Sequence, residues 1–157
     1  MPITLRPLDA DVFAPFGQVI SRPIRVGDRA SYETGLSNHR PQATIRLWAN
    51  HIQPTTLPLV ATKLERHRHS SQTFLPLSVS RYVVIVAPSL ASGAPDVDAI
   101  AGFIAEATQG ITYAADVWHN PICALDEPAG FAVLMWKDDS PGDEEWATLL
   151  DPIYFEI

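Results

Sequence analysis

The sequence predicts an all-β domain: a jelly-roll barrel of short strands with two or three short helices at its periphery. Short apolar and β-branched segments recur along the chain, and turn residues separate them at intervals of roughly eight to twelve residues. Proline accounts for 14 of the 157 residues, which disfavours long helices because proline removes a helical hydrogen bond. With 46% hydrophobic residues the chain can bury a core, and its length suits one domain spanning residues 1–157.

The N-terminal part is predicted to hold one short helix and one long loop. Residues 8–17 fit a helix that Asp9 caps, because an aspartate side chain accepts hydrogen bonds from the free N–H groups of a first turn. Residues 19–20 are expected to be extended. Residues 21–42 are polar, with several glycines and prolines, and a loop of this length is often functional, so we expect a functional or lid-like role for it.

The rest of the chain is predicted to be mainly strands. Residues 43–52 alternate, with Arg46 and Trp48 on one face and apolar side chains on the other, as in a half-buried strand. Asp96 is expected to cap a second short helix ending near residue 101, and residues 144–150 to form one or two helical turns. Further strands are expected at residues 60–64, 73–77, 82–87, 103–105, 111–113, 117–119, 122–125, 131–136 and 152–157.

Charge and cysteine content exclude several classes of protein. Eleven lysine and arginine residues against 18 acidic residues give a formal net charge of −7, which would repel a phosphate backbone, so we expect no nucleic-acid partner. Cys123 is the one cysteine, which leaves no internal disulfide and no cysteine-rich zinc site. No apolar run is long enough to span a bilayer and the N-terminus lacks a secretory pattern, so we expect a cytoplasmic protein without membrane contact.

One polar cluster has the composition of a metal or acid/base site. Glu65 and His67 are two residues apart and therefore share a face of an extended segment. Gln72 follows shortly after, and His119 lies near the end of a later predicted strand. Neutral imidazoles brought together with a carboxylate and an amide inside a barrel could bind a divalent metal or transfer protons. The alternative is that residues 65–69 form a charged surface hairpin.

The spacing is similar to the two ligand motifs of cupin barrels. Glu65, His67 and Gln72 fall where the first motif, H-x-H-x(3–4)-E, has its ligands, and His119 falls at the histidine of the second motif, P-x-G-x-x-H. If His67 and His69 were instead the two histidines of the first motif, no carboxylate would follow four or five residues later in the sequence. We therefore expect Glu65, His67, Gln72 and His119 to form the inward set, as metal ligands and catalytic groups.

Longer motifs resemble those of the ureidoglycolate lyase family. Leu64-Glu65-Arg66-His67, followed by Ser71-Gln72-x-Phe74-x-Pro76, resembles the signature L-E-R-H-P-x-x-[ST]-Q-x-F-x-P. Supporting matches are Phe13-Ala14-Pro15-Phe16-Gly17, Gly110-Ile111-Thr112-Tyr113 and Val117-Trp118-His119-x-Pro121. The resemblance implies a cupin-like fold, often dimeric, and cleavage of ureidoglycolate to urea and glyoxylate late in allantoin and purine breakdown. It also implies nickel dependence, and we therefore expect a divalent metal, nickel or manganese, as the cofactor.

The chain departs from the family pattern at a few positions. Arg68 stands where the family usually has proline, Asn120 replaces a frequent second histidine, and Met135-Trp136 replace an Asp-Arg pair. These departures motivate a second hypothesis, a non-catalytic cupin that binds a small carboxylate as a sensor or interaction domain. A third hypothesis is a structural domain with an empty barrel.

Ureidoglycolate elimination requires a base, an acid and a partner for the substrate carboxylate. His67 or His119 could be the base because imidazole titrates near neutral pH. Glu65 could orient a histidine or bind a metal, and Gln72 could bind the ureido group or the metal.

Three other residues are candidates for binding the substrate. Arg46 could hold the substrate carboxylate, because a guanidinium binds a carboxylate through two hydrogen bonds. It could equally be a surface charge. Tyr113 and Trp118 could line the pocket, or they could belong to the core of the barrel.

Overall fold

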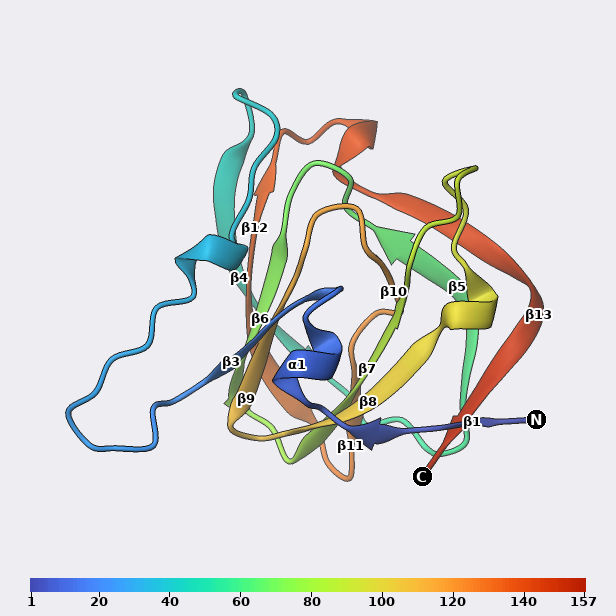
Figure 1. The fold of residues 1–157 in the computed structure, drawn as a ribbon, viewed down its shortest axis with the longest axis horizontal. Coiled ribbons are helices and arrows are strands. Elements are labelled where there is room, and N and C mark those ends of the chain that lie inside the picture. The colour runs from blue at the N-terminus through green and yellow to red at the C-terminus, as the bar shows by residue number, and fades with distance from the viewer.

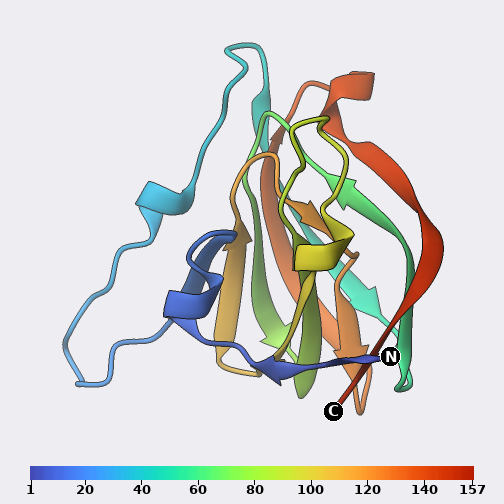
Figure 2. The same cartoon turned by 45° about the vertical axis from the view of Figure 1, so that its right-hand side comes forward.

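The computed structural model describes residues 1–157 and confirms the all-β, cupin-like barrel (Figure 1). One sheet has eight strands in the order β1-β13-β5-β10-β7-β8-β2, with β11 paired to β7, and the other has five strands in the order β3-β9-β6-β12-β4. The two sheets curve around a common interior (Figure 2). The only helices are α1 and three short 3-10 segments, and none is long and apolar enough to cross a membrane.

The strands are short, except for β4, β5, β12 and β13, which form two long antiparallel pairs. Their bounds are β1 Ile3–Thr4, β2 Arg6–Pro7, β3 Gly17–Ser21, β4 Thr44–Ile52, β5 Leu59–Arg66, β6 Gln72–Ser78, β7 Arg81–Ala87, β8 Ala101–Glu106, β9 Gln109–Tyr113, β10 Trp118–His119, β11 Cys123–Leu125, β12 Ala129–Lys137 and β13 Glu145–Glu156. The helical segments are α1 Ala10–Phe13, η1 Glu33–Gly35, η2 Val97–Ala99 and η3 Pro141–Asp143.

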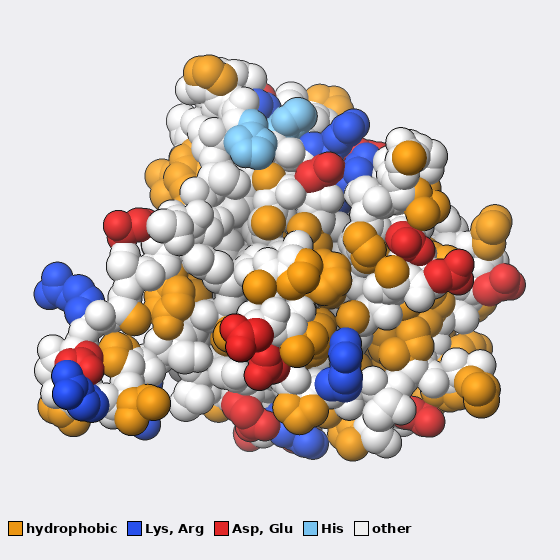
Figure 3. Space-filling view, in the orientation of Figure 1, with side chains coloured by type: hydrophobic (Ala, Val, Ile, Leu, Met, Phe, Trp, Pro, Cys, Tyr) orange, Lys and Arg blue, Asp and Glu red, His pale blue; other side chains and the backbone are white.

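Two buried clusters fill the molecule and leave one end of the barrel open. Tyr82 and Phe131, in edge-to-face contact at 5.1 Å, belong to the cluster between the sheets, while Ile85 and Trp118 belong to a second cluster on the other face of the eight-stranded sheet. Strand β7 supplies alternate residues to both clusters, which explains its continuous apolar sequence. On the face shown in Figure 3, histidine side chains gather at the upper end, beside lysine and arginine side chains.

Three expectations about local structure are corrected. Residues 144–150 do not form helical turns but begin strand β13, which pairs with β5 over most of its length. The predicted helix at residues 8–17 is helical only at Ala10–Phe13, because residues 14–16 form a turn that leads into β3, which begins at Gly17. The second short helix is a single 3-10 turn that Asp96 caps and that ends at Ala99, before β8 begins.

Strand β4 confirms the predicted alternation, but its polar face is the one that faces the barrel. Trp48 and Ile52 pack against the core between the sheets, while Ile45 and Leu47 are 55% and 71% exposed. Arg46 has the same parity as Trp48 and so lies on the inner face near the rim. Ile45 and Leu47 therefore lie on the outside of the five-stranded sheet.

Candidate functional site

The open end of the barrel brings one carboxylate and two imidazoles together. Glu65, near the end of β5, is the register partner of His119 in β10, and His67 follows directly after β5. One potential ligand atom from each of the three residues lies within 4.8 Å of the other two. The two imidazole rings are 5.3 Å apart between centroids. The structure thus places side chains from two distant segments in one cluster, as the sequence predicts.

Backbone carbonyl groups fix the tautomer of both histidines. Nδ1 of His67 lies 2.8 Å from the carbonyl oxygen of Asp143, and Nδ1 of His119 lies 2.9 Å from that of Val117. Because a carbonyl oxygen can only accept a hydrogen bond, each Nδ1 carries the proton and each Nε2 keeps a lone pair. Both Nε2 atoms are buried without a hydrogen-bond partner, so they are available as ligands or bases.

The electrostatics of the cluster keep it close to neutral. Burial, followed by the neighbouring His67, lowers the pKa of His119 to about 3, and burial also lowers the pKa of His67. Burial, followed by the charge of Glu144, raises the pKa of Glu65 to about 7. The imidazoles are therefore uncharged at neutral pH, and the 3.6 Å contact between His119 Nε2 and Glu65 Oε1 is neither an ion pair nor a hydrogen bond.

The donor set fits a divalent cation. Two neutral imidazole nitrogens and a carboxylate are ligands that zinc, nickel and manganese accept in proteins. The side-chain oxygen of Gln72 is a further buried atom without a partner. A cation at this position would satisfy these atoms and would reverse the penalty of ionising Glu65. Glu65, His67 and His119 can therefore bind a metal.

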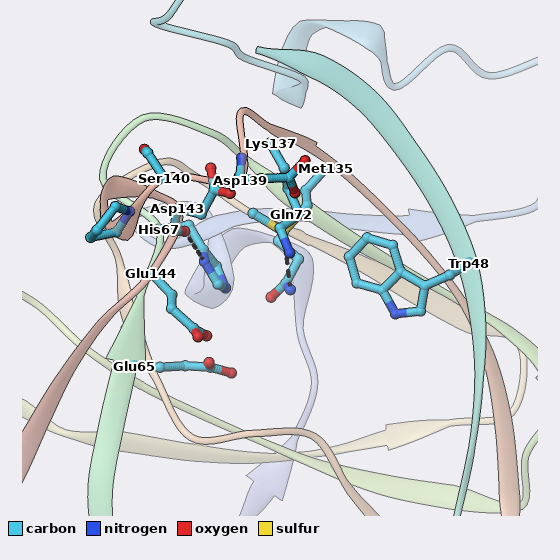
Figure 4. A pocket seen from close by; sticks show the side chains of 11 residues that line it. Trp48, Glu65, His67, Gln72, Met135, Lys137, Asp139, Ser140, Asp143 and Glu144 are labelled. Atoms are coloured by element: carbon cyan, nitrogen blue, oxygen red, sulfur yellow. Dashed lines mark hydrogen bonds between the residues drawn. The ribbon is translucent and has the colours of Figure 1, made fainter.

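Two members of the cluster, Glu65 and His67, line a cavity of about 350 Å³ (Figure 4). Glu65 and His67 come from β5 and its end, Gln72 from β6, and one wall is the connection from β12 to β13. The lining is mostly polar: Trp48, Glu65, His67, Gln72, Met135, Lys137, Asp139, Ser140, Pro141, Asp143 and Glu144. A pocket of this size and polarity suits a small polar molecule rather than a polymer.

Three of the four residues predicted to face inward line this cavity, and His119 lies directly behind them at 1% exposure. Gln72 Nε2 is 3.7 Å from the sulfur of Met135, which leaves Gln72 Oε1 free. Tyr113 is not on the cavity wall but stacks on the His119 ring, with centroids 4.1 Å apart and an interplanar angle of 14°. It therefore supports His119 from within the core.

The other two predicted binding residues lie outside the cavity. Trp118 is 1% exposed in the second buried cluster, and its indole N–H donates to the Gly93 carbonyl at 3.1 Å. Arg46 does not line the cavity, although its guanidinium donates at 2.7 Å to Asp139, which does. A carboxylate in the cavity therefore has a different nearby cation.

That cation is Lys137, which the sequence interpretation missed together with Glu144. Lys137 has the same parity on β12 as Val133 and Met135, so its side chain belongs to the inner face. Its ammonium is close enough to lower the pKa of His67, although burial of His67 is the main cause. The predicted strand ended at residue 136 and residues 144–150 were expected to be helical, so neither residue was assigned to the site.

A cupin-like barrel with a carboxylate and two imidazoles converging at its open end defines the class of this protein. The family model described as ureidoglycolate lyase matches residues 1–153. The chain belongs to the ureidoglycolate lyase family, as the motifs predict.

Relatives named ureidoglycolate lyase match this chain over most of their length. Proteins named ureidoglycolate lyase are 35% identical in Burkholderia cepacia, covering 92% of this chain and 89% of the relative, and 38% identical in Chelativorans sp. BNC1, covering 84% and 83%. Among solved structures, a dTDP sugar isomerase from Desulfovibrio desulfuricans G20 aligns with a TM-score of 0.49 at 14% identity, covering 82% of this chain and 72% of that one.

Proposed function

We propose that this protein is a ureidoglycolate lyase that releases urea and glyoxylate from ureidoglycolate in allantoin and purine catabolism. The observation that carries the proposal is the convergence of Glu65, His67 and His119, with both Nε2 atoms free, in a member of that family. The cavity beside them also contains an ammonium group, which a small anionic substrate requires.

The reaction is an elimination at one carbon. A base removes the hydroxyl proton, the O–H electrons form the carbonyl of glyoxylate, and the C–N bond breaks towards nitrogen. That nitrogen takes up a proton and leaves as urea. The site must therefore accept a proton, return one to nitrogen, and hold the carboxylate in a fixed orientation.

We assign the cluster as the binding site of a divalent metal, nickel or manganese. Glu65, His67 and His119 would hold this metal, and Gln72 Oε1 would be a further donor. When bound, such a cation supplies Lewis acidity to a substrate oxygen. A histidine whose Nε2 binds a metal cannot transfer a proton through the same atom, so the proton must be moved by another group.

Glu144 is the group that we assign to proton transfer. It lines the cavity, carries no ion pair, and is close enough for its charge to raise the pKa of Glu65. Its carboxylate can accept the hydroxyl proton and return it to the departing nitrogen. Trp48 and Met135 form the apolar part of the wall and limit the access of water.

Lys137 is expected to hold the substrate carboxylate. Replacing Lys137 with methionine should raise KM for ureidoglycolate by about tenfold or more, with a much smaller change in kcat, because a charged hydrogen bond contributes about 1.5–3 kcal/mol to binding. Arg46→Met is the matched control, since Arg46 does not line the cavity and its guanidinium is bound to Asp139. Equal effects of the two substitutions on KM would contradict the assignment.

The proposal is tested by mixing the purified protein with ureidoglycolate and measuring urea and glyoxylate, with added Ni²⁺ or Mn²⁺ and after chelation. Equal amounts of both products, formed faster with metal than after chelation, are expected. No release under any condition would contradict the lyase. Thermal stabilisation by glyoxylate without turnover would instead support the non-catalytic, carboxylate-binding cupin.

We further propose a cytoplasmic homodimer. The apolar outer face of the five-stranded sheet supports a dimer, because Leu47 on β4 and Leu77 on β6 are 71% and 64% exposed there. The free thiol of Cys123 is compatible with a reducing compartment. Sedimentation equilibrium should return twice the chain mass of 17.2 kDa, and a monomer at micromolar concentration would contradict the dimer.

A further inference from the structure

The wall of the cavity between β12 and β13 is held in place by an arginine that lies outside the cavity. Arg40 Nη1 donates to Asp138 Oδ1 at 2.8 Å, and Arg40 Nη2 donates to Asp143 Oδ1 at 2.7 Å. The side chain of Arg40 is only 10% exposed. One guanidinium thus joins the two ends of the segment 138–143, about a hundred residues further along the chain.

The carboxylate of Asp143 connects this arginine to the fold of the segment. It accepts hydrogen bonds from the backbone N–H groups of Asp138 at 3.0 Å and Asp139 at 2.8 Å. The segment therefore closes around one buried carboxylate, and Arg40 neutralises that carboxylate. Without the guanidinium, Asp143 would be a buried charge without a cation, which is costly.

Asp143 also contacts the cluster of Glu65, His67 and His119 through its backbone. The carbonyl oxygen of Asp143 accepts the hydrogen bond from His67 Nδ1 at 2.8 Å. That bond decides which nitrogen of His67 carries the proton, and so whether Nε2 presents a lone pair to the cavity. The position of the Asp143 carbonyl is in turn set by its side chain, which Arg40 holds.

Arg40 is itself fixed against the loop that follows β5. The N–H of His39 donates to the His69 carbonyl at 2.8 Å, and the N–H of Ser71 donates to the Ser37 carbonyl at 3.0 Å. The end of the long loop 21–42 is therefore attached to the chain on both sides of the cluster: to residues 69–71 by backbone bonds and to residues 138–143 by Arg40.

We propose that Arg40 is a positioning residue of the site, which acts through Asp143 to hold His67 as the Nδ1–H tautomer with Nε2 directed into the cavity. Arg40 touches neither the cavity nor the cluster. This role gives the end of the loop 21–42 a function, as a brace for the site rather than a lid. The effect on turnover rests on the proposed function, whereas the effect on the tautomer does not.

Arg40→Met is compared with Arg46→Met, which also removes a guanidinium bound to the segment 138–143. Arg46 pairs with Asp139 at 2.7 Å, but both side chains are exposed, at 45% and 64%. The direct readout is two-dimensional ¹H–¹⁵N NMR of the ring nitrogens in the metal-free protein labelled with ¹⁵N-histidine, with the His67 signals assigned from their loss in His67→Gln.

In the wild type and in Arg46→Met we expect the His67 proton on Nδ1. In Arg40→Met the two ring nitrogens should move towards a common shift as the tautomers interconvert, and the affinity for Mn²⁺ alone should fall about 10–100-fold, the usual effect of losing a group that orients a ligand. If ureidoglycolate is the substrate, kcat should fall more than KM rises.

Arg40→Lys keeps the charge but can reach only one of the two carboxylates well, so it should restore part of the Nδ1–H population and of the Mn²⁺ affinity. It also serves if Arg40→Met does not fold. The proposal is overturned if a folded Arg40→Met protein keeps the wild-type tautomer and Mn²⁺ affinity, or, where Arg40→Met does not fold, if Arg40→Lys keeps both. Loss of the tautomer in Arg46→Met to the same degree would also overturn it. Absence of ureidoglycolate turnover in the wild type would contradict the lyase assignment alone.

Discussion

Replacing His119 with glutamine should lower kcat/KM for ureidoglycolate by about a thousandfold and abolish the stabilisation of the protein by Ni²⁺ or Mn²⁺. His119 contributes one of the two imidazole nitrogens of the cluster, and its ring is held between the Val117 carbonyl and the Tyr113 ring, so no neighbour can replace it. Losing a metal ligand removes the Lewis acidity that the cation would supply, which is worth several kcal/mol, or about a thousandfold in rate. His67→Gln should behave in the same way.

His69→Gln is the matched control, and it also tests the register. His69 is two residues beyond His67, but it does not line the cavity. It contributes to the structure here through its backbone carbonyl, which accepts a hydrogen bond from the N–H of His39, and not through its ring. Activity should be measured as glyoxylate release, and metal binding as the shift in melting temperature with metal alone. A His119→Gln protein that keeps both would contradict the site, as would an inactive His69→Gln protein.

The two-residue period of a strand accounts for what the sequence could and could not locate. It placed Glu65 and His67 on one face, and the register of β5 with β10 then brought His119 opposite Glu65. The same period shows why Trp118 is not in the cavity: neighbouring residues of a strand face opposite sides, so an inward His119 requires an outward Trp118. Both had been assigned to the site.

Other parts of the site depend on contacts between distant segments. The direction of the Arg46 guanidinium is decided by Asp139, and the contact of Arg40 with Asp143 joins residues 103 positions apart. Glu144 directly precedes β13, and its place at the cavity depends on the pairing of β13 with β5 rather than on local propensity. No pattern within one segment contains this information.

The metal-free protein should become more stable at alkaline pH when Glu65 is replaced with glutamine. Burial and the charge of Glu144 raise the pKa of Glu65 from 4.5 to about 7 in the folded state. The folded protein then binds this proton more tightly than the unfolded chain does, so ionisation of Glu65 reduces stability as the pH rises from about 4.5 to 7. A pKa displacement of this size corresponds to at most about 3 kcal/mol.

The two histidines contribute to the pH dependence of folding stability with the opposite sign to Glu65. Their pKa values are lowered in the folded state, so they contribute stability above about pH 6.5, the ordinary value for histidine, and that stability is lost as the pH falls. Because the wild type and Glu65→Gln share both histidines, the difference between the two proteins isolates Glu65. The difference should be close to zero at pH 4.5 and reach its maximum, in favour of Glu65→Gln, above pH 7.

The measurement is urea denaturation in a chelator at several pH values between 4.5 and 8. Glu144→Gln is the control: by removing the neighbouring charge it should bring the pKa of Glu65 down and recover a smaller part of the same stability. Added Mn²⁺ should reverse the order, since it stabilises only a protein that keeps the Glu65 carboxylate. A stability difference that does not change with pH would contradict this prediction, as would a less stable Glu65→Gln protein at pH 8. Either result would show that burial does not oppose the ionisation of the Glu65 carboxylate. The cluster would then lack the electrostatic reason to bind a cation.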